Sequence, residues 1–364
     1  MAPRTKMPAG EGAPSELASG EAEFAGRRPT INDIARLADV SKKTVSRVIN
    51  KSRFVKDETR EKVEAVIERF GYAPDPQARG LAFRRSFLIG LIYDNPSPQY
   101  VIDMQQGILG AVRGSGLELV VHPCNRGEES FLADVRAFVE RQKLFGVVLP
   151  PSVSEDERVA ALLDEIDCPF VRIASVPLDR PQSMVRTHDA HGAGEAARHI
   201  ASLGHKRVAI VSGPTTFRSS HERGRGFEEG LAENGLRLSP EHRCEGAYTF
   251  ESGIECGARL LAGKNRPTAI FAGNDEMAAG VYKAARDAGL EIPRDLSIVG
   301  YDDSPLASRV WPPLTSVRLP IRDMGRMAAE KLLQRAGEEP ELAAVKTEVV
   351  PSLVVRQSTA APPG

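Results

Sequence analysis

The sequence predicts an N-terminal helix-turn-helix headpiece of three helices, followed by an α/β core of two doubly wound parallel-sheet subdomains. Three observations predict this fold class. Residues 30–50 carry two short helical patterns on either side of a tight turn, and residues 57–70 carry a third. From Phe87 onward, short apolar runs alternate with amphipathic segments. Such alternation specifies parallel sheets with helices on both faces.

The first two helices are predicted from capping and apolar spacing. Thr30 can cap a helix that ends at Asp39 and Val40, with five apolar residues at helical spacing: Ile31, Ile34, Ala35, Leu37 and Ala38. Ser41 starts the second helix, in which Val45, Val48 and Ile49 point to one side. The other side is left with Lys42, Lys43, Thr44 and Arg47. Such a helix pair can place its second helix in a DNA major groove.

A third helix is expected from Asp57 to Phe70, ended by Gly71. The headpiece core is then predicted to consist of Ile34, Leu37, Val45, Val48, Val63 and Ile67. The loop from Asn50 to Phe54 places Lys51 and Arg53 where they can meet phosphates.

Positive charge is concentrated in this N-terminal part of the chain. Residues 27–85 carry fifteen Lys or Arg and eight Asp or Glu, a net charge of +7, although the whole chain has a net charge of −1. Residues 1–26 contribute −2 and residues 86–364 contribute −6. A phosphate-binding module requires such a local excess, and the remainder of the chain does not compete for a polyanion.

Residues 30–35 (TINDIA) and 40–50 (VSKKTVSRVIN) resemble the headpiece of the LacI/GalR family of bacterial transcription regulators. The resemblance implies a dimeric, operator-binding repressor that responds to a sugar or another metabolite, and a sugar is favoured over a purine by family frequency alone. Lys42, Lys43 and Thr44 are expected at base edges. Arg47, Lys51 and Arg53 are expected at phosphates or in assisting the readout of bases. The complete set of expected headpiece contacts is Thr30, Ser41, Lys42, Lys43, Thr44, Arg47, Asn50, Lys51 and Arg53.

Residues 74–85 follow the headpiece and contain Pro74 and Pro76, which break a helix. A plain linker is one interpretation. In the resembled family this segment is a hinge helix that orders on the operator, and Leu81 matches the leucine that wedges into the minor groove. Gly80 would make a free hinge less helical, since glycine costs about 1 kcal/mol in a helix.

The resemblance also implies that the rest of the chain folds like the periplasmic binding proteins. In that architecture the ligand cleft lies where the carboxyl ends of two sets of strands face each other. Residues 86–364 are expected to form this core. The first lobe should comprise about 86–184 and 318–341, and the second about 185–317 and 342–357.

Seven residues are expected to contact the effector. By resemblance, Arg223 matches a cleft arginine, Tyr248 an aromatic that stacks on the ligand, and Asn274 with Asp275 the start of an Asn-Asp-x-Met-Ala-x-Gly motif. Phe217 and Ser219 share the loop before Arg223, and Asp94 ends the first strand of the other lobe. Asp302, in Gly300-Tyr301-Asp302-Asp303, is a secondary candidate at a strand end.

Motifs for other chemistry are weak. Gly192 and Gly194 fit a G-x-G-x-x-A pattern, but the stretch from Met184 to His191 is polar and predicts no strand before it, and no carboxylate follows at the spacing that a dinucleotide site needs. A helix that opens with small residues explains the pattern better. No nucleophile elbow or His-x-x-x-His pair is present, so an enzyme is not expected.

The composition indicates a cytoplasmic protein without a membrane span. Residues 1–26 are rich in Pro, Gly, Ala, Ser and Glu and lack the apolar stretch of a signal peptide, so a disordered leader is expected. The four cysteines are scattered without metal-ligand or redox spacing, and reduced thiols without a metal site or cofactor are expected: Cys124, Cys168, Cys244 and Cys256. The alternatives are a sugar-transport binding protein and a carbohydrate enzyme, which the basic headpiece and the missing catalytic motifs disfavour.

Overall fold

The computed structural model describes residues 27, 29–49, 54–72, 87–335 and 346–363. The chain divides into two compact units, the headpiece up to Arg84 and the core from Arg85 onward. The expected leader, the hinge with Leu81, and three expected DNA contacts (Asn50, Lys51 and Arg53) lie outside the described residues.

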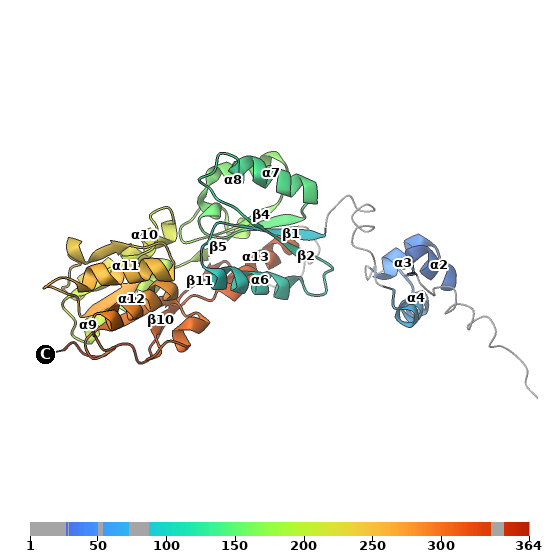
Figure 1. Cartoon of the computed structure of the whole chain (residues 1–364). Helices are drawn as coiled ribbons and strands as arrows, with labels where there is room; N and C mark the ends of the chain where they lie inside the picture. Colours follow the sequence, from blue (N-terminus) through green and yellow to red (C-terminus); the bar gives the residue numbers. More distant parts are fainter. Residues whose placement is uncertain (1–26, 28, 50–53, 73–86, 336–345, 364) are drawn as a thin grey trace, which may run out of the picture. The chain divides into compact units, whose positions relative to one another are not determined.

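The headpiece contains the three predicted helices, α2 (Ile31–Leu37), α3 (Lys42–Ile49) and α4 (Asp57–Phe70), shown in blue in Figure 1. Its core is built from residues of all three helices and is close to the predicted one: Ile34, Ala35, Ala38, Val45, Val48, Val55 and Val63 are buried. Two predicted core residues, Leu37 and Ile67, are only half-buried, and Ala38 takes the fully buried position next to Leu37. Gly71 ends α4 in the left-handed conformation that glycine tolerates, as predicted.

A short polar cluster fixes the start of α2. The Asp33 carboxylate accepts hydrogen bonds from the Thr30 backbone N–H at 2.8 Å and from the Thr30 hydroxyl at 2.7 Å. Arg27 adds a bidentate pair to the same carboxylate at 2.8 and 3.0 Å. The hydrogen bonds from Arg27 and then from Thr30 hold the pKa of Asp33 well below its usual value.

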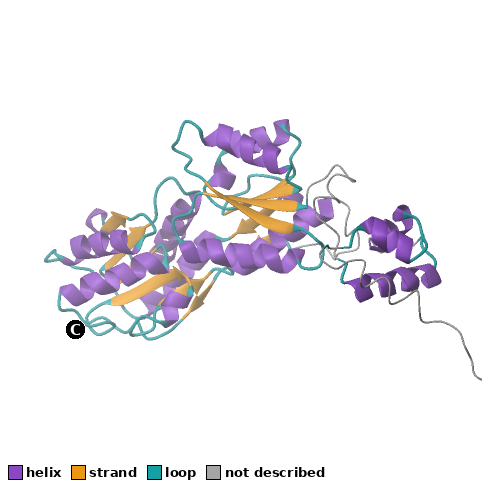
Figure 2. Ribbon diagram, turned by 45° about the vertical axis from the view of Figure 1, so that its right-hand side comes forward, coloured by secondary structure: helices purple, strands orange, loops and turns teal. Residues whose placement is uncertain are grey.

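The core consists of two lobes, each with a six-stranded sheet (Figures 1 and 2). The first sheet has the order β11-β5-β4-β3-β1-β2, with strands β1 (Leu88–Tyr93), β2 (Glu118–Pro123), β3 (Gly146–Leu149), β4 (Phe170–Ala174), β5 (Met184–Thr187) and β11 (Glu348–Val349). The second has the order β12-β10-β9-β8-β6-β7, with strands β6 (Val208–Ser212), β7 (Arg243–Glu245), β8 (Ala269–Ala272), β9 (Ser297–Asp302), β10 (Thr315–Arg318) and β12 (Ser352–Val354). Neighbouring strands are parallel except β10 and β12. The predicted fold class is confirmed.

Helices cover both faces of each sheet, as Figure 2 shows. The first lobe carries α6 (Pro98–Val112), α7 (Phe131–Gln142), α8 (Glu157–Glu165) and α13 (Ile321–Arg335); the second carries α9 (Asp189–Ser202), α10 (Arg218–Ala232), α11 (Phe250–Leu261) and α12 (Asp275–Asp287). Short 3-10 helices are η1 (Val153–Glu155), η2 (Pro181–Ser183), η3 (Pro240–His242) and η4 (Pro305–Ser308). Paired helices approach through glycine: a Cβ at Gly107 of α6 would overlap the Arg322 carbonyl of α13, and one at Gly226 of α10 would overlap the Ala190 carbonyl of α9.

The chain crosses between the lobes three times, and two crossings differ from the expected boundaries. β5 pairs with β4, so the first lobe extends to Thr187 rather than 184. β11 pairs with β5 in the first sheet, although residues from 342 onward were expected in the second lobe. The polar stretch before Gly192 therefore does contain a strand, which removes one argument against a dinucleotide site. The missing carboxylate at the required spacing still argues against such a site, and so does packing, since Gly192 and Gly194 lie within α9 and Gly194 faces α10.

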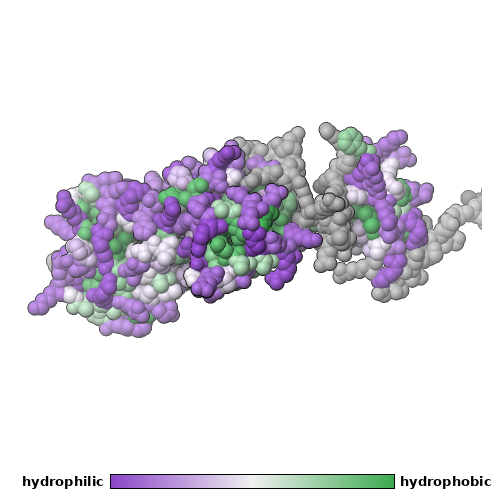
Figure 3. Space-filling model, turned by 90° about the horizontal axis from the view of Figure 1, so that it is seen from above, coloured by the Kyte–Doolittle hydropathy of each residue, from purple (hydrophilic) through white to green (hydrophobic). Residues whose placement is uncertain are grey.

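One prediction about the cysteines is wrong. Cys244 on β7 and Cys256 on α11 form a disulfide, whereas all four cysteines were expected to be reduced. Cys124 and Cys168 are free, and burial raises the pKa of each thiol to about 12. On the face of the core in Figure 3, hydrophilic side chains predominate around smaller apolar patches. In the described part of the chain, no helix has the length and apolar character to cross a membrane.

Candidate functional site

The exposed face of α3 carries the basic and hydroxyl residues that the sequence predicts there. Lys42, Lys43 and Arg47 are exposed, while Val45 and Val48 on the opposite side are buried in the headpiece core. Ser41 precedes the helix, and its hydroxyl accepts a hydrogen bond from the Thr44 backbone N–H at 3.1 Å. The first turn of α3 is thereby capped, with two lysines presented on its surface.

A cavity of about 30 Å³, here called the inner cavity, lies between the two lobes. Five of the seven predicted effector contacts line it: Phe217, Ser219, Arg223, Tyr248 and Asn274. The sequence interpretation missed several polar side chains that also line it: Asn95, Ser97, Tyr100, Thr187 and Asp189. Asp302, the secondary candidate, lines it as well.

Arg223 is the centre of this cavity's polar network. Its Nε donates to Asp189 Oδ1 at 2.8 Å, and its Nη1 donates to the Gly273 carbonyl at 2.6 Å. The guanidinium also lies over the Tyr301 ring, 3.8 Å from the ring centroid, where a cation–π interaction is favourable. Thr187 donates a hydrogen bond to the second oxygen of Asp189. Arg223, in the second turn of α10, and Asp189, the first residue of α9, therefore hold each other in place.

Three buried polar groups in the cavity wall have no hydrogen-bond partner among the described residues. They are the hydroxyls of Tyr100 and Tyr248, residues that are each 6% exposed, and Oδ1 of Asp302. Asp302 Oδ1 lies 3.7 Å from Arg223 Nη1, which is an ion-pair distance but too long for a hydrogen bond. Burial raises the pKa of Asp302 to about 8, and Arg223 only partly opposes this. Unpaired buried polar atoms are costly, so a ligand that hydrogen-bonds to them gains affinity.

Asp275 and Asp94, the other two predicted effector contacts, do not line the inner cavity. Asp275 Oδ1 accepts a hydrogen bond from the Ser316 hydroxyl at 2.6 Å, and Oδ2 accepts one from the Ser304 backbone N–H at 2.7 Å. Burial nevertheless raises the pKa of Asp275 to about 7. Asp94 pairs with Arg126 Nε at 3.0 Å at the edge of the first lobe.

Two contacts from the first lobe bridge to the second beside the cavity. Arg126, which also holds Asp94, donates from Nη2 to the Thr216 carbonyl at 3.2 Å. Glu155 Oε2, on η1, accepts a hydrogen bond from the Arg218 backbone N–H at 3.0 Å, at the first residue of α10. Both contacts require the lobes to be close together, so they stabilise the closed arrangement seen here.

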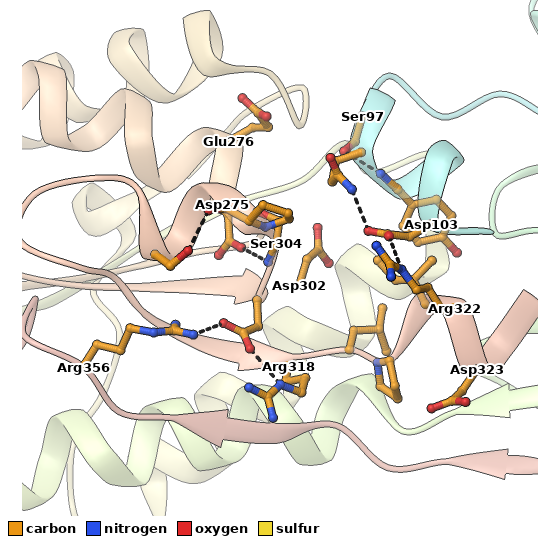
Figure 4. Close-up of a pocket in the computed structure, with 18 residues that line it drawn as sticks. Ser97, Asp103, Asp275, Glu276, Asp302, Ser304, Arg318, Arg322, Asp323 and Arg356 are labelled. Carbon is orange, nitrogen blue, oxygen red and sulfur yellow. Dashed lines mark hydrogen bonds and ion pairs between the residues drawn. The ribbon is translucent and has the colours of Figure 1, made fainter. Parts of the chain in front are cut away.

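A larger cavity of about 430 Å³, here called the outer pocket, adjoins the inner cavity (Figure 4). The two cavities share the side chains of Ser97, Tyr100, Asp302 and Leu319 in their walls. In Figure 4, Asp302 lies between Asp275 and Glu276 of the second lobe and Asp103 of the first. Polar groups from both lobes therefore surround a space large enough for a small organic molecule.

Comparison with known proteins relates both parts of the chain to one family. Residues 30–75 match "Bacterial regulatory proteins, lacI family", and residues 197–359 match "Periplasmic binding protein-like domain". The catabolite control protein A of Priestia megaterium is 34% identical over 311 residues, which covers 85% of this chain and 93% of that protein.

Two solved structures are similar over almost the whole chain. The complex of the transcriptional regulator CelR with cellobiose is 30% identical with a TM-score of 0.68, covering 91% of this chain and 100% of that one. The lac repressor dimer bound to operator and the anti-inducer ONPF is 28% identical with a TM-score of 0.73, covering 92% and 100%. The chain therefore belongs to the lacI family of bacterial regulatory proteins, and it is a transcription regulator and not an enzyme.

Proposed function

We propose that this protein is a repressor that binds a palindromic operator as a homodimer and is controlled by a small molecule, a mono- or disaccharide, bound between the two lobes. The observation that carries the proposal is the presence in one chain of a capped helix with exposed lysines and a cleft with unpaired buried polar groups. Since operator DNA lies in the bacterial cytoplasm, the protein acts there.

The DNA contacts come from α3. Lys42, Lys43 and Thr44 read base edges in the major groove, and Arg47 contacts a phosphate. The similar lac repressor structure is a dimer on operator, which supports the same use of the headpiece here. The proposal includes a minor-groove contact by Leu81 from a hinge at 74–85, a segment that lies outside the described residues.

The effector is a sugar because the cleft offers both hydrogen-bonding groups and aromatic surfaces. Tyr100 and Asp302 provide unpaired oxygens, and Phe217 and Tyr248 pack edge to face with ring centroids 5.4 Å apart. The similar CelR structure holds cellobiose, which supports a saccharide as ligand. A ligand that binds the open and closed lobes with different affinity shifts their balance and, through the hinge, the operator affinity.

The homodimer accounts for an exposed apolar surface on the second lobe. Trp311 is 87% exposed and lines a surface cavity together with Tyr282, Val310 and Pro312. Large exposed aromatic side chains with apolar neighbours are typical of protein interfaces. A second copy of this chain is the partner, as in the similar lac repressor dimer.

A direct test replaces one lysine on α3. Lys43→Ala is expected to weaken binding to DNA from upstream of the protein's own gene by about 1–3 kcal/mol, the usual cost of losing a base contact. Fluorescence anisotropy with the full chain measures the affinity at fixed salt. Lys62→Ala, which removes the same charge from the exposed surface of α4, is the matched control. Equal weakening by both variants would mean that α3 contributes charge but no specific contact.

A further inference from the structure

The charges around the inner cavity and the outer pocket do not balance. Together the two cavities are lined by seven carboxylates and four arginines, an excess of three negative charges. Three of the four arginines are already paired: Arg318 and Arg356 both contact Asp303, and Arg322 contacts Asp103 at 2.6 Å. The fourth, Arg223, is paired with Asp189. Arg223 Nη1 also lies 3.7 Å from Asp302 Oδ1, but the guanidinium donates its hydrogen bonds to Asp189 and Gly273, so none of these arginines donates one to Asp302 Oδ1.

Asp302 lies where the two cavities meet, and it is a buried carboxylate with an oxygen that accepts no hydrogen bond from the described residues. Its Oδ1 has no hydrogen-bond partner among the described residues, although its side chain is only 11% exposed. Asp275, nearby in the second lobe, differs because both of its oxygens accept hydrogen bonds. The Tyr100 hydroxyl, also unpaired and buried, is in the same shared wall. Both observations point to a ligand at this junction rather than to a structural ion pair.

A neutral sugar brings no positive charge that could stabilise the ionised form of the Asp302 carboxylate. An anionic sugar would add a like charge beside a carboxylate, which is strongly unfavourable in a desolvated site. A compact ammonium group can donate up to three hydrogen bonds and carries the compensating charge. It therefore fits the unpaired oxygen of Asp302 better than a hydroxyl does.

We propose that the effector carries a protonated amine that binds Asp302 at the junction of the inner cavity and the outer pocket, as an amino sugar or a disaccharide containing one would. This inference rests on the proposed function, since it names the chemical class of the ligand of the same cleft. The sugar ring fills the space between the lobes, and the amine lies against the Asp302 carboxylate. The outer pocket, with its greater volume, accommodates a second sugar unit.

The titration of Asp302 supports this assignment. The charged groups that act on it are Arg223 on α10, which lowers its pKa, and Asp275, Asp189 and Asp103, on three other helices, which raise it. With a pKa of about 8, Asp302 is largely protonated at pH 7 in the absence of a cation. A bound ammonium lowers this pKa, so amine binding at pH 7 releases a proton to the buffer. Binding of a neutral sugar releases none.

The test compares neutral, amine-bearing and anionic saccharides with the same ring size, as monosaccharides and as β-1,4-linked dimers. Glucose, glucosamine and glucuronate, with cellobiose and the β-1,4-linked dimer of glucosamine, are titrated calorimetrically into the full chain at pH 7. At least one amine-bearing ligand is expected to bind about tenfold or more tightly than its neutral counterpart. Glucuronate is expected not to bind. Repeating the titration in buffers of different ionisation enthalpy measures the proton release, which is expected only for the amines.

Two variants test whether Asp302 causes the preference for amine-bearing ligands. Asp302→Asn is expected to reduce the amine preference to less than about twofold, and asparagine tolerates the positive φ of 102° at this position. Glu233→Gln removes a carboxylate that is 57% exposed, is paired with Arg198 and lines neither cavity, and it is expected to keep the preference. Thermal melting without ligand verifies that both variants fold.

The outcomes separate this inference from the proposed function. Neutral sugars that bind as tightly as the amines would overturn the amine assignment and leave a sugar-controlled repressor in place. An amine preference that persists in Asp302→Asn would overturn the role of Asp302. If all five saccharides fail to bind while operator binding is intact, the sugar effector fails and this inference fails with it.

Discussion

Arg223 Nε donates a hydrogen bond to Asp189 Oδ1 at 2.8 Å, and both side chains are almost fully buried, at 9% and 2% exposure. Arg223→Ala leaves the Asp189 charge buried without its partner. The free energy of unfolding is expected to fall by about 3–5 kcal/mol, the usual cost of breaking a buried ion pair by removing one side. Urea denaturation of the full chain, followed at the core transition, measures the loss.

Arg225, two residues further along α10, supplies the control. It pairs with Glu222 and Glu229, but its side chain is 51% exposed. Surface pairs contribute little, so Arg225→Ala is expected to cost at most about 1 kcal/mol. Similar losses for both variants would mean that the buried network around Asp189 contributes no more than a surface pair.

The interlobe contact of Glu155 predicts a local change in hydrogen exchange. Glu155→Ala removes the acceptor for the Arg218 backbone N–H, which then has no partner at the start of α10. Loss of such a cap costs about 0.5–2 kcal/mol, so exchange of the Arg218 amide is expected to accelerate about 2- to 30-fold. Glu165→Ala, at an exposed position on α8, is the control and should leave that amide unchanged. Unaltered exchange in Glu155→Ala would exclude the contact as a determinant of lobe closure.

The headpiece is expected to lose stability in acid because of Asp33. Its pKa is lowered in the folded state, first by Arg27 and then by Thr30, so the unfolded state binds more protons as the pH falls toward the usual value of a carboxyl. The contribution of ionised Asp33 to the stability of the headpiece is therefore complete above about pH 4 and is lost progressively below that pH. Amide exchange in α2 and α3 of the intact chain measures this between pH 6 and pH 3.

Two variants test that dependence. Asp33→Asn is expected to destabilise the headpiece at pH 6 and to reduce the further loss at pH 3. Asp39→Asn, in the exposed turn after α2, removes the same charge without a comparable hydrogen-bond cluster. A parallel pH dependence of wild type and Asp33→Asn would show that another group controls the acid transition.

Trp311 is the only tryptophan in the sequence, so intrinsic fluorescence reports on its surroundings. If it lies between two copies of the chain, its emission in the dimer is blue-shifted and poorly quenched by iodide. Trp311→Arg is expected to yield monomers by analytical ultracentrifugation, because it places a charge in a desolvated contact. Dimers with fully quenchable Trp311 emission would place the interface elsewhere.

The sequence predicts the elements with strong periodicity better than the short ones. α3 and α4 are long enough to show an apolar stripe, and Gly71 marks the end of α4. β5 has only four residues, and Arg186 interrupts its apolar pattern, so this strand was not predicted. The lobe boundaries near Thr187 were misplaced for this reason. β11 has two residues within a segment, 345–355, that was expected as one strand of the second lobe.

Contacts between side chains that are far apart in the sequence also could not be predicted from sequence patterns. Asp275 follows a strand as expected, but its oxygens are taken by Ser304 and Ser316, whose positions depend on the folded second sheet. Cys244 and Cys256 are separated by 12 residues on a strand and the next helix, a spacing that matches no redox motif. Arg223 could be predicted as an effector contact by resemblance. Its partner Asp189 could not, because it follows β5, a strand that was not predicted.

The account depends on coupling between the cleft and the headpiece, and operator affinity with and without sugar measures that coupling directly. Operator binding by the full chain is titrated alone and with saturating amounts of each saccharide named above. At least one is expected to change the operator affinity by about 5- to 150-fold, and the operator should change the affinity for that sugar by the same factor. A saccharide that binds the cleft but leaves operator affinity unchanged would contradict the account, as would failure to bind any fragment of the upstream DNA at low salt.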